Sequence, residues 1–226
     1  MGDASVLDAV LAPLYAAVLE PERLSEFSAA LCTATRSQVG AVMAHDPGRG
    51  GGRLDLLVGA DPVHMAAYER EYAAENPWMH SGQHLMVPGG MMDSDAVLPR
   101  SRLKRTRYYN EYLREFQVEQ SLALCARADA QDVVVATLCR SGGIAYDDAE
   151  LALVRRVTPH WANAWAILSR LGWLERRMQT LEAAVDASPL AMMMLDGRAY
   201  ALRINAAAVR LLSAGAVIRL DHGRPD

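Results

Sequence analysis

The chain has 226 residues, 51% hydrophobic and 22% charged, so it is large and apolar enough to bury a substantial core. Its formal net charge of −4 argues against a nucleic-acid-binding surface, which needs a basic field. Three cysteines at unrelated spacings form neither a disulfide framework nor a zinc pattern, and no segment reaches the ~18 apolar residues of a membrane span. The N-terminus is acidic and lacks the basic region of a signal peptide, so we expect a cytoplasmic protein that does not associate with membranes.

The first 75 residues alternate between helical and strand-like patterns. Apolar residues recur at helical spacing over 4–19, where Pro13 is expected to bend or split the helix, and Pro21 fits the first turn of a second helix. Residues 38–45 and 53–59 are strand candidates. The glycine-rich loop that joins them has neither dinucleotide-motif spacing nor a P-loop lysine, so we expect a turn. Asp61-Pro62 begins a third helix, which Asn76-Pro77 ends.

The middle of the chain predicts a second pair of strands. Residues 77–98 are expected to be irregular apart from a short strand at 91–93, and residues 99–116 to be helical, in one or two pieces. Residues 119–128 and 132–140 then form a predicted antiparallel hairpin with strongly β-favouring valines. This order describes an α+β domain over residues 1–146, with a mainly antiparallel sheet flanked by helices.

Residues 147–188 predict one long helix. Asp147, three residues before Glu150, is a capping-box-like start, and Pro159 predicts a kink. Two series of seven-residue repeats, offset by three, form an a/d seam typical of a helix that pairs with another helix. We therefore predict a two-stranded coiled coil and a homodimer. The predicted dimerisation residues are Val157, Ala164, Ile167, Leu171, Leu174, Met178, Leu181 and Val185.

The two halves of this helix differ in the width of their apolar face. In the first half, Trp161, Trp165 and other apolar residues widen the face, as expected of a helix that covers its own domain. In the second half only the seam is apolar. His160 occupies a d position, where we favour a buried or interface histidine satisfied by a carbonyl; the alternative is a pH-sensitive interface.

Residues 189–226 predict a strand at 190–195, a strand at 200–203 and a helix at 205–212. This order is that of the opening of a second α/β sensory module. The last 14 residues are too few to complete an ordinary domain.

Four segments carry a resemblance to a known group. They are YEREYAAENPW from Tyr68, VLPRSRLKRTRYYNEYL from Val97, IAYDDAELALVRRVTPHWANA from Ile144 and LDGRAYALRINAAAVRLL from Leu195. In this order and at these distances, the chain resembles the N-terminal regulatory regions of LuxR-type helix-turn-helix transcriptional regulators. The resemblance covers roughly residues 60–213 and implies a GAF-like or PAS-like sensory fold, with a PAS-like segment at 189–226.

The sequence departs from this group in two respects. Trp161 stands where the group often has leucine. Nothing after Leu212 corresponds to the C-terminal DNA-binding domain of the group. Either the sequence is the sensory part of a longer protein, for which DNA binding is implied, or the natural protein has lost this domain.

A ligand site is expected between the sheet and the helices that cover it. Methionines and aromatic residues are interleaved in this part of the chain, and such residues make adaptable walls for a small apolar or aromatic ligand. The alternative is that they are ordinary core residues without a ligand. The candidate ligand-binding residues are Met43, Met65, Tyr68, Tyr72, Trp78, Met91, Tyr108, Tyr109, Tyr112 and Cys125.

Other motifs argue against metal binding and catalysis. His80 and His84 have the spacing of a metal pair, but Ser81-Gly82 breaks the helix that such a pair needs, so no metal is expected. Cys125 and Cys139 lack a recognisable His-plus-acid partner and are expected to be core residues. The basic run from Arg100 to Arg107 predicts a solvated face, or a docking surface for an acidic partner or for the DNA-binding domain. We expect no cofactor and no enzymatic activity. The predicted function is that of a sensor; a ligand-independent dimerisation module is second and an enzyme third.

Overall fold

The computed structural model describes residues 3–130, 132–141, 144–214, 220–221 and 224–225. The chain divides into two compact units, Met1–Ser169 and Arg170–Asp226, and the division falls inside the long helix α7 (Asp148–Ala187). Within the described ranges, no helix combines the length and the apolar character needed to cross a membrane.

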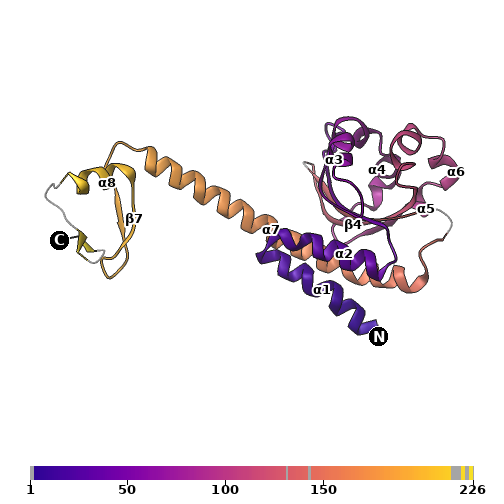
Figure 1. Ribbon diagram of the computed structural model, residues 1–226, viewed down its shortest axis with the longest axis horizontal. Coiled ribbons are helices and arrows are strands. Elements are labelled where there is room, and N and C mark those ends of the chain that lie inside the picture. The colour runs from indigo at the N-terminus through magenta and orange to yellow at the C-terminus, as the bar shows by residue number, and fades with distance from the viewer. Residues whose placement is uncertain (1–2, 131, 142–143, 215–219, 222–223, 226) are drawn as a thin grey trace. The chain divides into compact units, whose positions relative to one another are not determined.

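The first unit is built on a five-stranded antiparallel sheet with the strand order β2-β1-β5-β4-β3 (Figure 1). The strands are β1 (Val39–His45), β2 (Gly52–Val58), β3 (Met91–Asp93), β4 (Val118–Ala128) and β5 (Val133–Ser141). Both predicted hairpins are present. The predicted α+β class, an antiparallel sheet flanked by helices, is confirmed.

Side-chain alternation along the strands creates a separate core on each face of the sheet. On β5, Val135 and Cys139 belong to one core, whereas Val134 and Leu138 belong to the other. The central strands are therefore buried on both faces, which explains their continuous apolar sequences.

Helices α1 (Asp3–Leu19), α2 (Leu24–Ala34) and the first part of α7 cover one face (Figure 1). A short 3-10 helix, Pro21–Arg23, joins α1 to α2, and α1 is continuous through Pro13. Trp161 of α7 is fully buried and stacks on Phe27 of α2, with ring centroids 5.7 Å apart. A large aromatic pair thus anchors α7 in this core.

Short helical segments cover the opposite face. They are α3 (Val63–Ala67), a π-helical turn (Tyr68–Tyr72), a 3-10 turn (Ala73–Glu75), α4 (Pro77–Gly82), a 3-10 turn (Gln83–Leu85), α5 (Ser94–Val97), α6 (Arg100–Leu103) and a second π-helical turn (Tyr108–Leu113). The prediction that residues 77–98 are largely irregular is wrong. Asn76 accepts a hydrogen bond from the backbone nitrogen of Trp78, so Asn76-Pro77 ends one helical segment and also caps the next.

The start of α7 is the predicted capping box. Asp147 Oδ1 accepts a hydrogen bond from the Glu150 backbone nitrogen, and Glu150 Oε2 accepts one from the Asp147 nitrogen, both at 2.9 Å. Glu150 is also buried against Arg140 of β5, whose Nη2 donates to Glu150 Oε1 at 2.6 Å. A buried ion pair therefore ties the first turn of α7 to the sheet.

The predicted dimer seam needs a correction in its first half. α7 is a single helix through Pro159, and Val157 and Ala164 are 0% and 1% exposed in the core beneath it. These two residues pack inside their own domain, so they are not available to a partner helix. The wide apolar face of the first half of α7 agrees with this position, because such a face is expected of a helix that covers its own domain.

The second unit contains the rest of α7, β6 (Met193–Leu195), β7 (Ala201–Ile204), α8 (Ala206–Ser213), β8 (Leu220–Asp221) and β9 (Arg224–Pro225). The predicted order of strand, strand and helix over 190–212 is confirmed. Asn205 is fully buried: its side chain donates to the carbonyls of Val185 and Leu190 and caps α8 at the Ala208 nitrogen. One asparagine thus joins the end of α7 to this segment.

Candidate ligand-binding site

The π-helical turns at Tyr68–Tyr72 and Tyr108–Leu113 place tyrosine rings over one face of the sheet. Tyr72 stacks on Tyr112 with ring centroids 5.0 Å apart, and Tyr68 lies 5.7 Å from Tyr112. Trp78 contacts Tyr108 edge-on at 6.2 Å. π-helical turns are rare and recur at functional sites, and here they bring both predicted aromatic helices into one cluster.

A buried hydrogen-bond chain fixes this cluster to the sheet. The Tyr68 hydroxyl lies 2.8 Å from Nε2 of His45, at the end of β1, and it accepts a hydrogen bond of 3.0 Å from Asn76 Nδ2. Burial lowers the pKa of His45 to about 4, so the ring is neutral at neutral pH and accepts the Tyr68 proton. The chain fixes Tyr68 in the core beside the cavity, although Tyr68 is not one of the lining residues.

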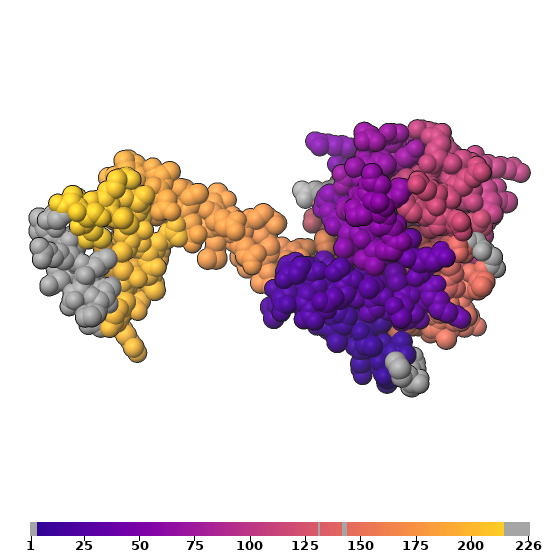
Figure 2. All heavy atoms as spheres, in the orientation of Figure 1, coloured from indigo at the N-terminus to yellow at the C-terminus, as the bar shows by residue number. Residues whose placement is uncertain are grey.

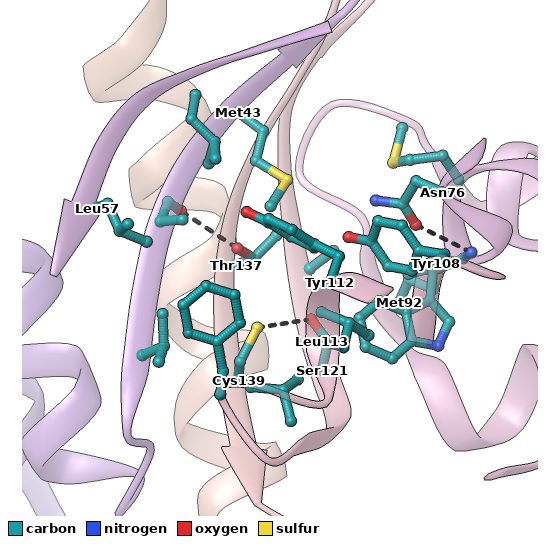
Figure 3. Close-up of a pocket in the computed structure, with 18 residues that line it drawn as sticks. Met43, Leu57, Asn76, Met92, Tyr108, Tyr112, Leu113, Ser121, Thr137 and Cys139 are labelled. Carbon is teal, nitrogen blue, oxygen red and sulfur yellow. Dashed lines mark hydrogen bonds between the residues drawn. The ribbon is translucent and has the colours of Figure 1, made fainter. Parts of the chain in front are cut away.

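A cavity of about 50 Å³ lies between the aromatic cluster and the sheet (Figure 3). Among the described residues, no charged side chain lines it. Its lining residues are Val39, Ala41, Met43, Leu54, Leu57, Asn76, Trp78, Met79, Met92, Tyr108, Tyr112, Leu113, Phe116, Val118, Ser121, Ala123, Thr137 and Cys139. An uncharged, largely apolar lining of this kind excludes ions and suits a neutral apolar or aromatic molecule.

Polar groups in the lining are few, and most are satisfied within the protein. Thr137 Oγ1 donates to the Ala41 carbonyl, and the Cys139 thiol donates to Ser121 Oγ (Figure 3). The indole Nε1 of Trp78 differs, because it is buried and has no hydrogen-bond partner among the described residues. An unpaired buried donor costs roughly 1–3 kcal/mol, so a lining residue carries an unsatisfied hydrogen-bond donor.

Four of the predicted ligand residues line this cavity: Met43, Trp78, Tyr108 and Tyr112. Five others belong to the same core or pack against it without lining the cavity: Met65, Tyr68, Tyr72, Tyr109 and Cys125. Tyr109 instead donates from its hydroxyl to Glu119.

The prediction for Met91 is wrong by one position along β3. Met91 pairs with Leu124 and packs in the core beneath α7, whereas Met92 pairs with Ala123 and lines the cavity. A one-residue change of register moves a strand side chain to the opposite face. β3 has only three residues, so its sequence shows no alternation of apolar and polar residues that would indicate which methionine faces the cavity.

Apart from Met43, the residues of β1, β4 and β5 that line the cavity were not predicted. Once Met43 is assigned to the cavity, alternation along β1 also places Ala41 and Val39 there, and the β1–β5 register adds Thr137 and Cys139 opposite them. The signal was therefore present in the strand pattern, but it required the pairing of distant strands.

The three thiols are poor candidates for nucleophiles. Burial raises the pKa of Cys139 and Cys125 to about 11 and that of Cys32 to about 12. At neutral pH these groups are almost entirely protonated, and the thiolate is the reactive form.

The histidines behave differently from one another. His80 Nε2 donates to the Ala74 carbonyl, and the described residues contain no group of three or more His, Cys, Asp or Glu positioned for a metal ion. His160 is partly buried and its Nδ1 lies 2.7 Å from the Tyr15 hydroxyl of α1. The predicted partner, a carbonyl, is therefore wrong; a hydroxyl takes its place.

The basic run of α6 and its surroundings is largely neutralised within the domain. Arg100 pairs with Asp95, Lys104 pairs with Glu119, and Arg107 contacts Glu75 and two further carboxylates. These pairs leave little net positive charge for an acidic partner, and the solvated-face interpretation fits the structure better.

The comparisons with known proteins identify the fold. No protein-family model matches the sequence, and comparison with curated proteins finds no match. Among solved structures, the VqsR LBD domain from Pseudomonas aeruginosa is similar, with a TM-score of 0.53 and 14% identity over 74% of this chain and 93% of that one. The GAF domain of a phosphoenolpyruvate-protein phosphotransferase from Coxiella burnetii gives a TM-score of 0.53 and 14% identity, covering 76% and 99% of the two chains.

A phycoerythrobilin-bound GAF domain from a cyanobacterial phytochrome is also similar, with a TM-score of 0.53 and 11% identity over 76% of this chain and 98% of that one. At these identities the likeness is one of fold. The first unit has a GAF-like fold, as the sequence resemblance implied.

Proposed function

We propose that the first unit is a sensory domain that binds a small, uncharged apolar or aromatic effector in the cavity beneath the tyrosine cluster. The observation that carries this proposal is the cavity itself. Within the described part of the chain its lining is uncharged and aromatic on one side, and the buried Trp78 Nε1 has no hydrogen-bond partner there. A domain that only needed a core would gain stability by filling this space. The similarity of the fold to GAF domains, one of which is bilin-bound, supports the proposal.

The size of the cavity sets a condition on binding. A volume of about 50 Å³ is smaller than the ~150 Å³ cavity that holds benzene, so an effector enters only if side chains move. Met43, Met79 and Met92 line the cavity, and methionine side chains rearrange more easily than branched ones. The ligand-bound state is therefore expected to be wider than the state described.

For the whole protein we propose a LuxR-type transcriptional regulator. The order of the four motif segments over residues 60–213 supports this assignment, and so does the fold similarity to the VqsR LBD domain. In this proposal α7 connects the sensory domain, through a PAS-like segment, to a C-terminal helix-turn-helix domain, and the exposed part of α7 forms a homodimer. The assignment predicts that the gene encodes a helix-turn-helix domain after residue 226. A coding sequence without one would contradict it.

The ligand is tested with a panel of small neutral aromatic and aliphatic compounds and the thermal unfolding of the 1–226 chain. A compound at 100 times its dissociation constant is expected to add about 2.7 kcal/mol to the free energy of unfolding. The Ala123→Val variant adds two methyl groups inside the cavity and should lose this response. The matched control is Ala126→Val, on the same strand but in the opposite core, which should keep it. A panel without any response, or an equal response in Ala123→Val, would contradict ligand binding in this cavity.

The small volume also favours a second candidate, a ligand-independent dimerisation module. In that case Ala123→Val stabilises the domain, no compound produces a shift, and the chain is still a dimer. The same experiments separate the two functions. We propose no enzymatic activity, because the thiols near the cavity are protonated and no charged side chain among the described residues reaches it.

A further inference from the structure

The second half of α7 presents an apolar face that the described residues of the chain leave exposed. The seam residues Ile167, Leu171, Leu174, Met178 and Leu181 are between 36% and 60% exposed. Figure 2 shows the atoms of this part of α7, in orange, exposed on the face in view. The hydrophobic repeat puts Leu171 and Met178 at a positions, and Leu174 and Leu181 at d positions.

Charged residues flank this seam in an ordered way. With the same a/d assignment, Arg170 and Arg177 occupy g positions on one side, and Glu175 and Glu182 occupy e positions on the other. Among the described residues, Arg170, Glu175 and Arg177 have no salt-bridge partner. Glu182 Oε1 lies 2.7 Å from Arg203 Nη1, and the Glu182 side chain is still 47% exposed.

Trp173 positions both arginines. The guanidinium carbons of Arg170 and Arg177 lie 5.0 and 5.1 Å from the centre of the Trp173 ring, within the range of cation–π attraction. The ring lies between the two g positions and holds both cations along the same edge of the seam. This arrangement reduces the side-chain entropy that each arginine loses when it forms an interhelical ion pair.

The charge order distinguishes the two possible orientations of a helix pair. In a parallel, in-register pair, each g residue faces the e residue of the next heptad on the other chain. Arg170 then meets Glu175 of the partner subunit, and Arg177 meets Glu182 of the partner subunit, so every pairing is attractive. In an antiparallel pair, g faces g and e faces e, which would oppose arginine to arginine and glutamate to glutamate.

We propose that the partner of this face is a second copy of the same chain, bound parallel and in register, and that the Arg170/Arg177 and Glu175/Glu182 pattern selects that orientation. The proposal rests on the dimerisation proposed above and adds the orientation, the register and the residues that set them.

Disulfide crosslinking of the 1–226 chain tests the orientation directly. Ile167→Cys and Leu181→Cys are made separately; the native cysteines are buried, so mild oxidation acts on the introduced thiols. The two positions are two heptads apart, about 21 Å along the helix, and a disulfide needs Cα atoms within ~7 Å. We expect each variant to form a covalent dimer with itself. Arg176→Cys, on the outer face of the helix, is the control and should not.

An antiparallel pair has only one point at which a residue meets its own copy, so it cannot give both self-crosslinks. A crosslink that forms only when the 167 and 181 variants are mixed would overturn the proposed orientation while leaving dimerisation intact. A wild-type chain that is monomeric by light scattering at tens of micromolar would instead overturn the dimerisation itself.

Charge reversal tests the role of the flanking residues. In the parallel pair, Arg170→Glu faces Glu175 of the partner subunit, and the dimer should weaken by about tenfold from the change of two symmetry-related pairs. The double variant Arg170→Glu/Glu175→Arg should recover the wild-type affinity. Arg176→Glu makes the same charge change outside the seam and should have little effect. In an antiparallel pair Arg170→Glu relieves repulsion, so a tighter Arg170→Glu dimer would overturn the proposal, as would a double variant without recovery.

Discussion

The indole nitrogen of Trp161 on α7 donates a hydrogen bond of 3.1 Å to the carbonyl oxygen of Leu124 on β4. The preceding residue on the strand, Ala123, lines the cavity on the opposite face of the sheet. One strand therefore carries the cavity wall on one side and the anchor of α7 on the other. Under the proposed function, a ligand that displaces β4 changes the packing of α7 without an intermediate element. Signalling of this kind requires that the ligand bind two packing arrangements with different affinity.

The anchor can be tested through stability. Trp161→Phe removes the hydrogen bond and leaves the Leu124 carbonyl buried without it, together with a small cavity. We expect a loss of about 2 kcal/mol in the free energy of unfolding, measured by urea denaturation. Trp173→Phe makes the same substitution at a site that is 42% exposed and should change stability by less than about 0.5 kcal/mol. Equal effects at both sites would show that Trp161 is not an anchor.

His45 predicts a pH dependence of stability. Burial lowers its pKa from 6.5 to about 4, so between these values the unfolded chain binds more protons than the folded chain. The free energy of unfolding should therefore fall as the pH is lowered through this window, by up to roughly 3 kcal/mol. His45→Gln removes the titrating group and should flatten the pH profile between pH 6.5 and 4. His84→Gln, at an exposed position, should leave the slope unchanged. A His45→Gln profile that matches the wild type would contradict the buried neutral histidine.

From the lowered pKa of Glu150 we expect a second loss of stability, at a lower pH than that caused by His45. Burial alone would raise its pKa, but hydrogen bonds from Arg36 and Arg140 outweigh this effect and hold the pKa below the ordinary value of 4.5. Its contribution to stability is present above that value and is lost as the pH falls through the lower folded pKa. Glu150→Gln should cost about 3 kcal/mol at pH 7, because the buried Arg140 loses its counter-charge. Glu22→Gln, at an exposed site, is the control for the amide substitution. A Glu150→Gln variant as stable as the wild type would mean that α7 does not depend on this ion pair.

Trp78 predicts a preference for ligands with a hydrogen-bond acceptor. Acetophenone and ethylbenzene are similar in size, but only acetophenone has a carbonyl. The wild-type chain should bind acetophenone about tenfold more tightly, since the carbonyl satisfies the orphaned indole donor. In Trp78→Phe the ratio of the two dissociation constants should approach one, whatever the overall loss of affinity. If the ratio is unchanged in Trp78→Phe, the indole nitrogen does not donate a hydrogen bond to the ligand.

Local patterns predicted much of this fold. The strand pairs at residues 38–59 and 119–140 follow from β-favouring runs and a glycine-rich loop, and the capping box at Asp147 follows from two residues and their spacing. The π-helical turns were not predicted. A π-helical turn contains one extra residue, but Tyr68 and Tyr72 are still four positions apart, which is also the spacing of an ordinary α-helix. The helices within residues 77–98 were not predicted, because an Asn-Pro pair such as Asn76-Pro77 can mark either the end of one helix or the start of the next.

The sequence predicted most of the aromatic residues of the candidate site and, on the sheet, Met43 alone. Trp78, Tyr108 and Tyr112 are conspicuous by residue type. Ala41, Ala123 and Thr137 line the cavity because of the sheet register, in which Thr137 pairs with Ala41 on one side and with Ala123 on the other. On α7, the width of the apolar face separated the covered half from the exposed half. The heptad positions of Val157 and Ala164 did not show that these residues are covered. The same spacing occurs in a helix that packs on its own domain and in a helix that pairs with another helix.

Methionine methyl NMR tests most directly whether an effector binds in the cavity beneath the tyrosine cluster. With ¹³C-labelled methionine methyl groups, Met43, Met79 and Met92 report from the cavity lining. Met193 and Met194 of the second unit serve as internal references. Titration of the 1–226 chain with a compound that stabilises it should shift the three cavity signals in a saturable way and leave the reference signals nearly unchanged. Signals of Met43, Met79 and Met92 that stay in place at saturating compound would contradict binding in this cavity.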